Sequence, residues 1–544
     1  MSDEEKQAVS CENGVWTRGI DPPGTSWQKF GGTLLNHMKN APEHVGQIDG
    51  NTGEEDTYAS MSDRAIRCAL WLKKQGLKAG DCIGICTDNH LNTITPLLAA
   101  IFSGIVFHPW WDMLLDDDMV KYFLRLTEPK VLFLKKEVSA LVQRSINDLH
   151  LEIKIVIFES SENQLSLQDI LMEQNSEEVE HFECTKIEDI NQPGIMLCTS
   201  GSTGYPKCVV HSYNWLEKCI NIFPKEKPTE WISLCFSKIC WIAAIALFLD
   251  AIRNHGTVVL NSVFTAENGC RLIEKYKITF MTMTAAIANQ FYKTENIKTR
   301  DLSSLRYVIY GGACVSERVD RHLAEIFPNA YVSLSYGSTE IGICLRRSKP
   351  ARKFCSSGRV ERNLQVKVVD IETGKTCGEN EKGEIYIKAP QMKIFHYHKD
   401  VEGTQKVLDS EGWYHSGDIG YHDADGDFFI IDRLKEVIKY KITFPVMPCA
   451  VEEVILKHPD VIEVAVVAKP HVYDVEQPMA FITLRAGSKV TEEEVLQLVR
   501  DNLPDHMRLR GGVKILDIMP HVVSGKISRK QLREMAKALA EETY

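Results

Sequence analysis

Apolar positions along the chain fall into short continuous runs that alternate with longer stretches of helical spacing. Residues 81–86, 130–134 and 153–158 are nearly continuous apolar runs, which is typical of strands buried on both faces of a sheet. The apolar residues of 97–102 predict a buried helix between the first two of these strands. Because strands and helices alternate in this way, the pattern predicts an α/β fold built of layered sheets.

A second pattern begins near residue 380, where the β segments become shorter. Residues 383–388 and 428–431 are predicted strands, and the charged string DRLKE at 432–436 follows them. A compact α+β pattern comes next, with a helix at 451–457, strands at 461–467 and 479–484, and a helix at 491–502. We therefore predict a large N-terminal domain over residues 1–432, with layered α/β sheets and a β-rich subdomain, and a small α+β domain over 433–544.

Length and composition are those of a soluble globular enzyme. The 544 residues exceed what one ordinary core organises and suggest roughly two to four domains or subdomains. Apolar residues make up 44% of the chain and charged residues 25%, so neither disorder nor a fibrous repeat is indicated. The net charge of −11 argues against broad nucleic-acid binding, and an anionic ligand would have to be held by local clusters of Lys and Arg.

Signals for secretion, membrane insertion and metal binding are missing from the sequence. The charged N-terminus is followed by no apolar segment, and the longest apolar stretch, 241–249, is far shorter than the roughly 20 residues of a membrane helix. The 16 cysteines are scattered, many of them within apolar runs, and none has zinc-ligand spacing. We therefore expect an intracellular, cytoplasmic protein without a transmembrane segment, whose cysteines are reduced and buried.

The most informative string is TSGSTGYPK at residues 199–207, which follows the apolar run 195–198. Hydroxyls and the backbone N–H groups of a glycine-rich turn donate to phosphate oxygens, and a lysine adds a mobile positive charge. The spacing differs from that of a Walker P-loop, because the two glycines lie too close together and a proline precedes the lysine. A solvated Ser/Gly turn is the alternative. The candidate phosphate-binding residues are Thr199, Ser200, Gly201, Ser202, Thr203, Gly204 and Lys207.

Four further strings accompany this loop: YGSTE at 336–340, YHSGD at 414–418, DRLK at 432–435 and SGK at 524–526. In this order and at roughly this spacing, the five strings resemble those of the adenylate-forming superfamily, which includes acyl-CoA synthetases and beetle luciferases. The resemblance spans the chain from about residue 30 to residue 535 and is strongest to the insect acyl-CoA synthetase and luciferase-like branch. It implies a small C-terminal domain that is mobile about a hinge near Lys435.

The resemblance implies a role for each string in the activation of a carboxylate by ATP. Pyrophosphate leaves as the carboxylate attacks the α-phosphorus, so negative charge must be neutralised on both sides of that atom. The loop that ends at Lys207 would hold the β- and γ-phosphates, Thr339 would donate to an α-phosphate oxygen, and Glu340 would hold Mg²⁺. Tyr336 and Gly337 would also contact the nucleotide. Residues 338–340 alone also fit a helix N-cap followed by an acid in the first turn.

The resemblance also implies residues for the adenine and the ribose. Asp418 would accept both ribose hydroxyls and Arg433 would bind the ribose from the other side of the domain boundary, although a surface ion pair between an Asp and an Arg is the alternative for both. Gly311, Gly312 and Ala313 follow the predicted strand 307–310 and would form a flat wall beside the adenine. The alternative for these residues is a tight strand-to-helix turn.

Three lysines of the C-terminal region complete the implied site. Lys526 would bridge the attacking carboxylate and the phosphate, where it stabilises charge that grows in the transition state. Lys435 matches the hinge about which the small domain turns between the two half-reactions. Lys439 matches a residue of the thioester-forming step, and a solvated position on a Lys/Tyr-rich strand is its alternative.

The chain departs from the family pattern at several positions. Cys208 and Ile442 stand where relatives usually carry glycine, and a β-branched Ile442 would narrow the channel for the pantetheine arm of coenzyme A. The histidine, aromatic and hydroxyl groups that a beetle luciferase places around luciferin are not supplied by Lys238, Cys240, Ala244 and Ile343. Efficient light production is therefore not expected. The stretch 241–249 would favour an apolar tail as a pocket wall, and it also fits a buried helix.

The hypothesis is an acid–thiol ligase that converts a carboxylic acid, ATP and coenzyme A to an acyl-CoA, AMP and pyrophosphate with Mg²⁺. The resemblance implies a medium- or long-chain fatty acid as the substrate, with hydroxycinnamate-like aryl acids as the next alternative. The alternatives are a luciferase-like adenylating oxidase and a non-catalytic homologue that binds a nucleotide or an acyl-adenylate. No nucleic-acid or protein partner is implied. Some relatives are peroxisomal, although residues 542–544 (ETY) are not the Ser-Lys-Leu type of signal.

Overall fold

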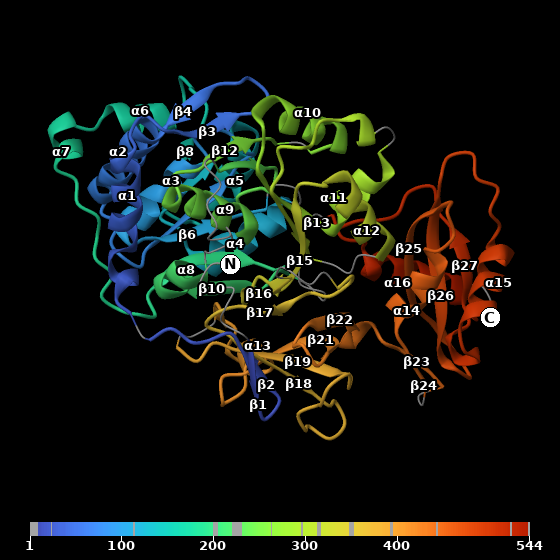
Figure 1. The fold of residues 1–544 in the computed structure, drawn as a ribbon. Helices are drawn as coiled ribbons and strands as arrows, with labels where there is room; N and C mark the ends of the chain where they lie inside the picture. The colour runs from blue at the N-terminus through green and yellow to red at the C-terminus, as the bar shows by residue number, and fades with distance from the viewer. Residues whose placement is uncertain are drawn as a thin grey trace.

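The computed structural model describes residues 9–22, 24–111, 115–199, 205–219, 231–262, 264–294, 297–312, 317–347, 353–391, 395–441, 444–522 and 525–541. Outside these ranges lie Ile442 and the predicted site residues Ser200, Gly201, Ser202, Thr203, Gly204 and Ala313. Figure 1 shows a large N-terminal body of layered sheets and helices, with the C-terminal residues forming a separate smaller unit at its side. This arrangement confirms the predicted fold class.

Two large sheets form the centre of the N-terminal body in the described part of the chain. The seven-stranded sheet has the order β20 (His396–Tyr397), β10 (Cys208–Ser212), β9 (Pro193–Cys198), β6 (Val106–Pro109), β5 (Cys82–Cys86), β7 (Val131–Leu134) and β8 (Lys154–Ile157). The nine-stranded sheet has the order β17 (Arg359–Val360), β16 (Gly342–Arg346), β15 (Tyr331–Ser338), β14 (Tyr307–Gly311), β13 (Phe280–Thr284), β11 (Ile232–Cys235), β12 (Thr257–Leu260), β3 (Val45–Asp49) and β4 (Glu55–Thr57). Their central strands are parallel, as the continuous apolar runs predicted.

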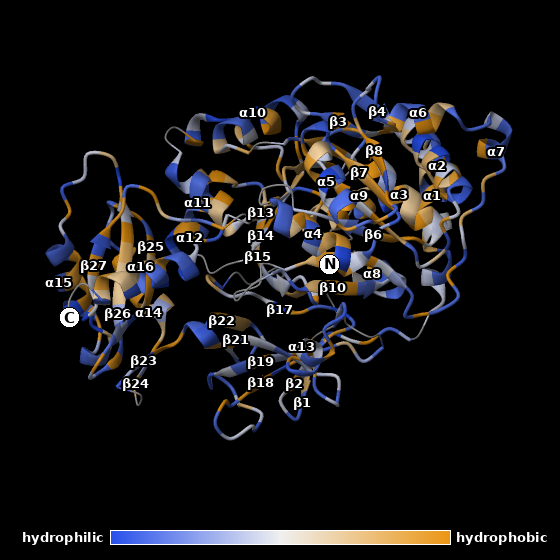
Figure 2. Ribbon diagram, turned by 180° about the vertical axis from the view of Figure 1, so that it is seen from behind, coloured by the Kyte–Doolittle hydropathy of each residue, from blue (hydrophilic) through white to orange (hydrophobic). Residues whose placement is uncertain are grey.

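Helices cover these sheets and supply much of the core. They are α1 (Phe30–Asn40), α2 (Tyr58–Lys74), α3 (Ile94–Ser103), α4 (Asp117–Thr127), α5 (Lys136–Asp148), α6 (Leu167–Met172), α7 (Ser176–Glu180), α8 (Tyr213–Cys219), α9 (Ile242–Arg253), α10 (Ala266–Tyr276), α11 (Ala285–Lys293), α12 (Glu317–Ile326) and α13 (Val401–Gln405), with 3₁₀ turns at Ser26–Lys29 and Ile297–Thr299. Figure 2 shows hydrophobic positions concentrated on α3 and neighbouring strands of the interior. Most of the stretch 241–249 is buried in α9, in agreement with its interpretation as a buried helix.

A third sheet forms the β-rich part of the N-terminal body. Its order is β1 (Ser10–Glu12), β2 (Val15–Thr17), β18 (Gln365–Val369), β19 (Gly383–Lys388), β21 (Tyr414–His422) and β22 (Phe428–Arg433). Inward residues alternate with half-exposed ones on β19, where Ile385 and Ile387 are buried, because successive side chains of a strand point to opposite faces. The strands predicted at 383–388 and 428–431 are therefore confirmed.

The smaller unit is a mixed sheet with a core on each face. Its strands are β24 (Phe444–Val446), β23 (Ile438–Tyr440), β26 (Val475–Leu484), β25 (Val461–His471) and β27 (Gly512–Ile515), and its helices are α14 (Pro448–Ile455), α15 (Glu492–Asn502) and α16 (Arg529–Glu541), with 3₁₀ turns at Leu434–Glu436 and Asp505–Met507. Along β25, Val464 and Val466 belong to one core, whereas Ala465 and Val467 belong to the other. All four elements predicted for this region are present, and the boundary at residue 432 stays a prediction.

Within the described ranges, no helix combines the length and the apolar character that crossing a membrane requires. The cysteines whose side chains the structure describes form no disulfide with one another, and most of them are buried, as their positions in apolar runs predicted. The strands β14, β15 and β21 and the loop that contains Lys526 meet where the two units adjoin, and the predicted site residues Gly312, Tyr336, Asp418 and Lys526 lie there.

Candidate active site

Glycines at the end of β14 form a smooth wall beside the neighbouring strand. Gly311 is paired with Ser335 of β15, and a Cβ on Gly311 would lie 2.4 Å from the Ser335 carbonyl oxygen. Gly312 follows with φ +85°, a conformation that favours glycine. The wall lies at the carboxyl end of parallel strands, where α/β sheets usually bind their ligands. This position is compatible with the predicted role beside the adenine and also with a tight strand-to-helix turn, so both interpretations stay open.

Tyr336 and Arg433 hold Asp418 from opposite sides. The Tyr336 hydroxyl donates to Oδ2 of Asp418 at 2.6 Å, and Arg433 Nε lies 3.1 Å from Oδ1. The Asp418 residue is 7% exposed. Burial and the neighbouring carboxylate raise the pKa of Tyr336, so its hydroxyl remains a donor. The predicted Asp–Arg ion pair therefore exists, but its carboxylate is buried rather than on the surface.

Asp418 lies within a strand. It belongs to β21 and is in register with Arg433 at the end of β22. Gly417 has φ +70°, which lets the strand deform locally and present the carboxylate. Because β21 and β22 are paired, Asp418 and Arg433 lie side by side although they stand on opposite sides of the predicted domain boundary.

Thr339 and Glu340 lie in the tight connection between β15 and β16, which pair antiparallel. No helix starts there among the described residues, so the alternative that residues 338–340 form a helix N-cap is wrong. The chain instead turns back and continues as β16, which pairs with β15 and extends the sheet. His211 of β10 donates from Nε2 to the Thr339 carbonyl oxygen at 2.7 Å, and its ring stacks on Trp215 at 3.7 Å. The seven-stranded sheet therefore fixes this connection.

Glu340 and Lys207 approach each other through Tyr397 of β20. The Tyr397 hydroxyl donates to Glu340 Oε1 at 2.9 Å, and Lys207 Nζ lies 4.4 Å from the centre of the Tyr397 ring. Lys207 Nζ also lies 3.8 Å from Asp400 Oδ2. The end of the glycine-rich loop and the YGSTE string thus meet at one tyrosine. Sequence reasoning missed Tyr397 and His211, because neither lies in one of the five strings.

The C-terminal unit contributes Lys526 to the same region. A Cβ on Gly312 would lie 3.7 Å from Lys526 Cε, and one on Gly525 would lie 3.2 Å from Ala286 Cβ of α11. The structure therefore brings the late lysine to the glycine wall, as its predicted role requires. Lys435 lies in a 3₁₀ turn, where burial and then the neighbouring Arg433 lower its pKa. Lys439 is exposed on β23, and the roles predicted for both lysines remain predictions.

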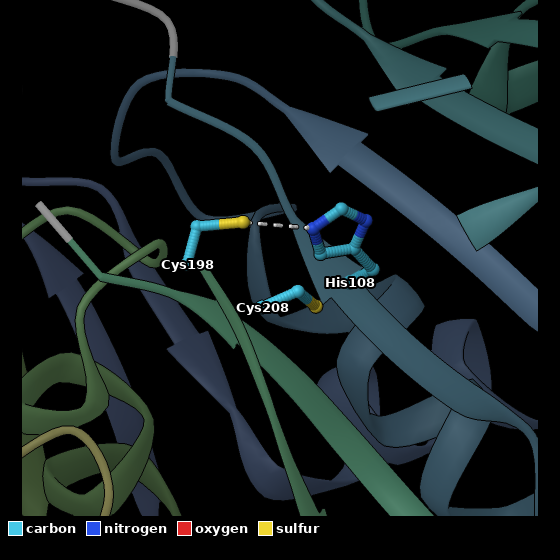
Figure 3. Close-up of side chains that lie close together, drawn as sticks. All are labelled: His108, Cys198 and Cys208. Carbon is cyan, nitrogen blue, oxygen red and sulfur yellow. Dashed lines mark hydrogen bonds between the residues drawn. The ribbon is translucent and has the colours of Figure 1, made fainter. Parts of the chain in front are cut away.

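Figure 3 shows a buried cluster of His108, Cys198 and Cys208, which come from β6, β9 and β10. Trp110 Nε1 donates to His108 Nδ1 at 3.1 Å, so the ring proton sits on Nε2, which lies 3.5 Å from Cys198 Sγ. Burial lowers the pKa of His108 to about 3, and the ring stays neutral. A protonated Nε2 offers no lone pair to a cation, so the cluster is a hydrogen-bonded chain rather than a metal centre.

A second cluster of possible ligands is occupied by a lysine. Asp423, Asp425 and Asp427 lie together in the turn between β21 and β22. Lys353 Nζ lies 2.5, 2.6 and 3.4 Å from their carboxylate oxygens. The ammonium group pairs with all three carboxylates, and Arg359 also pairs with Asp427, so these ion pairs hold the turn together.

Lys238, one of the positions compared above with the luciferin pocket, takes part in a network of ion pairs. Asp88 lies 2.9 Å from Lys238 Nζ and 3.0 Å from Lys135 Nζ. Burial alone would raise the pKa of Asp88, but hydrogen bonds from the two lysines lower it to about 2. These ion pairs place charged side chains beside the end of β11. The sequence pattern alone did not predict this contact.

The stability that Asp88 contributes should depend on pH in a defined window. Its pKa falls from the ordinary value of 3.8 to about 2 on folding, so the contribution is complete above the ordinary value and is lost as the pH falls through the folded value. We expect the difference in melting temperature between the wild type and Asp88→Asn to be full above about pH 4 and to shrink toward pH 2. A difference that does not change between pH 5 and pH 2.5 would contradict the pairing.

Comparison with known proteins identifies the family. The sequence profile of AMP-binding enzymes matches residues 35–393, and that of the AMP-binding enzyme C-terminal domain matches residues 450–526. The chain belongs to the AMP-binding enzyme family. These matches confirm the adenylate-forming superfamily that the five strings predicted.

Two relatives and one solved structure place this AMP-binding enzyme more closely. It is 30% identical to 4-coumarate–CoA ligase 4 of Arabidopsis thaliana over 91% of this chain and 89% of that protein. Luciferin 4-monooxygenase of Luciola mingrelica is 30% identical over 89% of this chain and 90% of that protein. The structure of the luciferase-like enzyme from the nonluminescent mealworm Zophobas morio is 27% identical, with a TM-score of 0.70 over 77% of this chain and 99% of that one. The protein therefore groups with adenylate-forming acyl- and aryl-CoA ligases and luciferases.

Proposed function

We propose that the protein is an AMP-forming acyl-CoA synthetase that activates a medium- or long-chain fatty acid with ATP and transfers it to coenzyme A. The observation that carries the proposal is the approach of Lys526, from the C-terminal unit, to the glycine wall at Gly312. A cationic group beside this wall would stabilise the charge that grows in the first half-reaction, which supports the proposal.

Several described side chains would each have a separate role in adenylation. Asp418, positioned by Tyr336, would accept the ribose hydroxyls, and Arg433 would support it from across the strand pair. Lys207 would exchange its contact with Asp400 for the β- and γ-phosphates, and Lys526 would stabilise the charge that develops as the carboxylate oxygen bonds to the α-phosphorus and pyrophosphate departs.

Glu340 fits the role of a magnesium ligand. Among the described residues, the hydrogen bond to its carboxylate is made at Oε1, which leaves Oε2 as a hard oxygen donor. Mg²⁺ typically takes one or two protein carboxylates and completes its shell with water and substrate phosphates, so one such oxygen suffices. The ion supplies neutralisation of phosphate charge when bound.

The luciferase-like oxidase is less well supported. Lys238 is held by Asp88, Cys240 is buried, and Ile343 is an apolar residue of β16, so these positions offer none of the groups that surround luciferin. A second candidate is an adenylating enzyme without the thioester step, and Ile442 in place of glycine favours it. In the full ligase, Lys435 would be the hinge of the small domain and Lys439 would serve the thioester step.

One assay separates these functions. Purified full-length protein is given ATP, Mg²⁺, coenzyme A and a panel of fatty and hydroxycinnamic acids, with pyrophosphate, acyl-CoA and light recorded in parallel. We expect pyrophosphate and acyl-CoA with medium- or long-chain fatty acids and no light. Pyrophosphate release without acyl-CoA would show that the protein catalyses adenylation but not thioester formation. A preference for hydroxycinnamic acids would overturn the proposal of a fatty-acid substrate. No product with any acid of the panel would favour the non-catalytic homologue.

A further inference from the structure

Tyr397 contacts both Glu340 and Lys207. It belongs to the two-residue strand β20, which pairs with β10 in a register that sets Tyr397 opposite Val209. The residue is 6% exposed. It therefore holds a fixed place between the glycine-rich loop that precedes β10 and the connection that follows β15.

The two contacts of Tyr397 use different parts of its side chain. The hydroxyl donates to Glu340 Oε1 at 2.9 Å. The ring faces Lys207 Nζ at 4.4 Å, a geometry in which the negative face of the ring attracts the ammonium group.

Each contact limits where a charged group can move. Glu340 is 9% exposed, and a buried carboxylate that lost its donor would turn toward another one or toward solvent. Lys207 has a long flexible side chain, and its ammonium is held between the Tyr397 ring and Asp400. The same tyrosine thus controls the direction of an anionic group and of a cationic group that lie at neighbouring points of the site.

We propose that Tyr397 is a positioning residue that aims the Glu340 carboxylate, through its hydroxyl, and the Lys207 ammonium, through its ring, at one bound triphosphate. The inference rests on the proposed adenylating function. In this proposal, Glu340 contributes to the Mg²⁺-dependent component of ATP affinity and Lys207 to the component that does not need Mg²⁺. Substitutions of Tyr397 should therefore change these two components separately.

Two variants of Tyr397 separate the parts. Tyr397→Phe removes the hydroxyl and keeps the ring, so we expect ATP binding without Mg²⁺ to be unchanged, while the Mg²⁺ concentration for half-maximal tightening of ATP binding rises about tenfold. Tyr397→Leu removes both contacts, and we expect ATP binding without Mg²⁺ to weaken as well, by about fivefold. Both quantities are measured by calorimetric titration of ATP in the absence of acid and coenzyme A, so they do not depend on turnover.

Tyr386 provides a matched control. It is a half-exposed tyrosine of β19, and its ring lies 5.6 Å from Lys367 Nζ, so it offers the same pair of substitutions outside the site. Tyr386→Phe and Tyr386→Leu should leave ATP binding and its dependence on Mg²⁺ unchanged.

The outcomes distinguish this inference from the proposed function. Wild-type Mg²⁺ dependence in Tyr397→Phe, or equal effects of the Phe and Leu variants on binding without Mg²⁺, would overturn the positioning role. A wild type that binds ATP with Mg²⁺ but releases no pyrophosphate with any acid would overturn the ligase and leave the positioning role to be judged by the variants. A wild type that binds no ATP would overturn both.

Discussion

Lys526→Ala is expected to lower the rate of pyrophosphate release by about 100- to 1,000-fold, the effect of removing one preorganised group that stabilises transition-state charge. The lysine reaches the glycine wall from the C-terminal unit, with its Cε 3.7 Å from the place of a Gly312 Cβ. Because it acts on charge that grows during the first half-reaction, ATP binding should change much less than turnover. Initial rates at saturating ATP and acid, together with an ATP titration, measure the two quantities.

Lys530 is the matched control for this lysine. It is exposed at the start of α16, four residues along the chain, so Lys530→Ala removes the same charge from the same unit away from the wall. Conversion of a supplied acyl-adenylate to acyl-CoA should survive in Lys526→Ala, since that step comes after the one it serves. Wild-type pyrophosphate release by this variant would mean that the Gly-Lys loop is wrongly assigned.

Asp320→Ala should be the most destabilising of these substitutions, by about 3–5 kcal/mol, because it leaves a buried guanidinium without its partner. Arg347 donates through both terminal nitrogens to Asp320, at 3.1 and 2.9 Å, and the two side chains are 0% and 1% exposed. The pair joins α12, which follows the glycine wall, to the end of β16, which follows Glu340. A loss of melting temperature and of ATP binding is therefore expected together.

Glu317 on the same helix is the matched control. Its ion pair with Arg321 is solvent-exposed, and exposed pairs contribute about 0–1 kcal/mol, so Glu317→Ala should change the melting temperature little. Scanning calorimetry of the three proteins compares them directly. Equal melting temperatures for Asp320→Ala and Glu317→Ala would show that the buried pair is not needed to hold the wall.

Much of the fold was predictable from local pattern. The apolar runs at 81–86 and 130–134 became β5 and β7, and the late α+β pattern became a sheet with a core on each face. Such runs specify strands because burial on both faces leaves no polar positions in them. The turn after Ser338 was less predictable, because a hydroxyl followed by an acid suits a helix start as well as a strand connection.

The sequence predicted the motif residues of the candidate site but not the residues that position their side chains. Asp418, Glu340, Lys207 and Lys526 lie in strings with recognisable chemistry, but the groups that position them carry no such signal. His211 lies 128 residues from Thr339, and Tyr397 lies 57 residues from Glu340. Likewise, His108 meets Cys198 only because β6 and β9 are neighbours in the sheet.

The sequence by itself determined the class of fold, the order of its elements and the five strings that identify the family, because periodicity and motif spacing are properties of neighbouring residues. Only the tertiary structure decided which groups face one another: Tyr336 and Arg433 on Asp418, Tyr397 between Lys207 and Glu340, and Lys526 at the glycine wall. These contacts depend on strand order, register and the approach of two units, which are set by the packing of whole elements rather than by any local pattern.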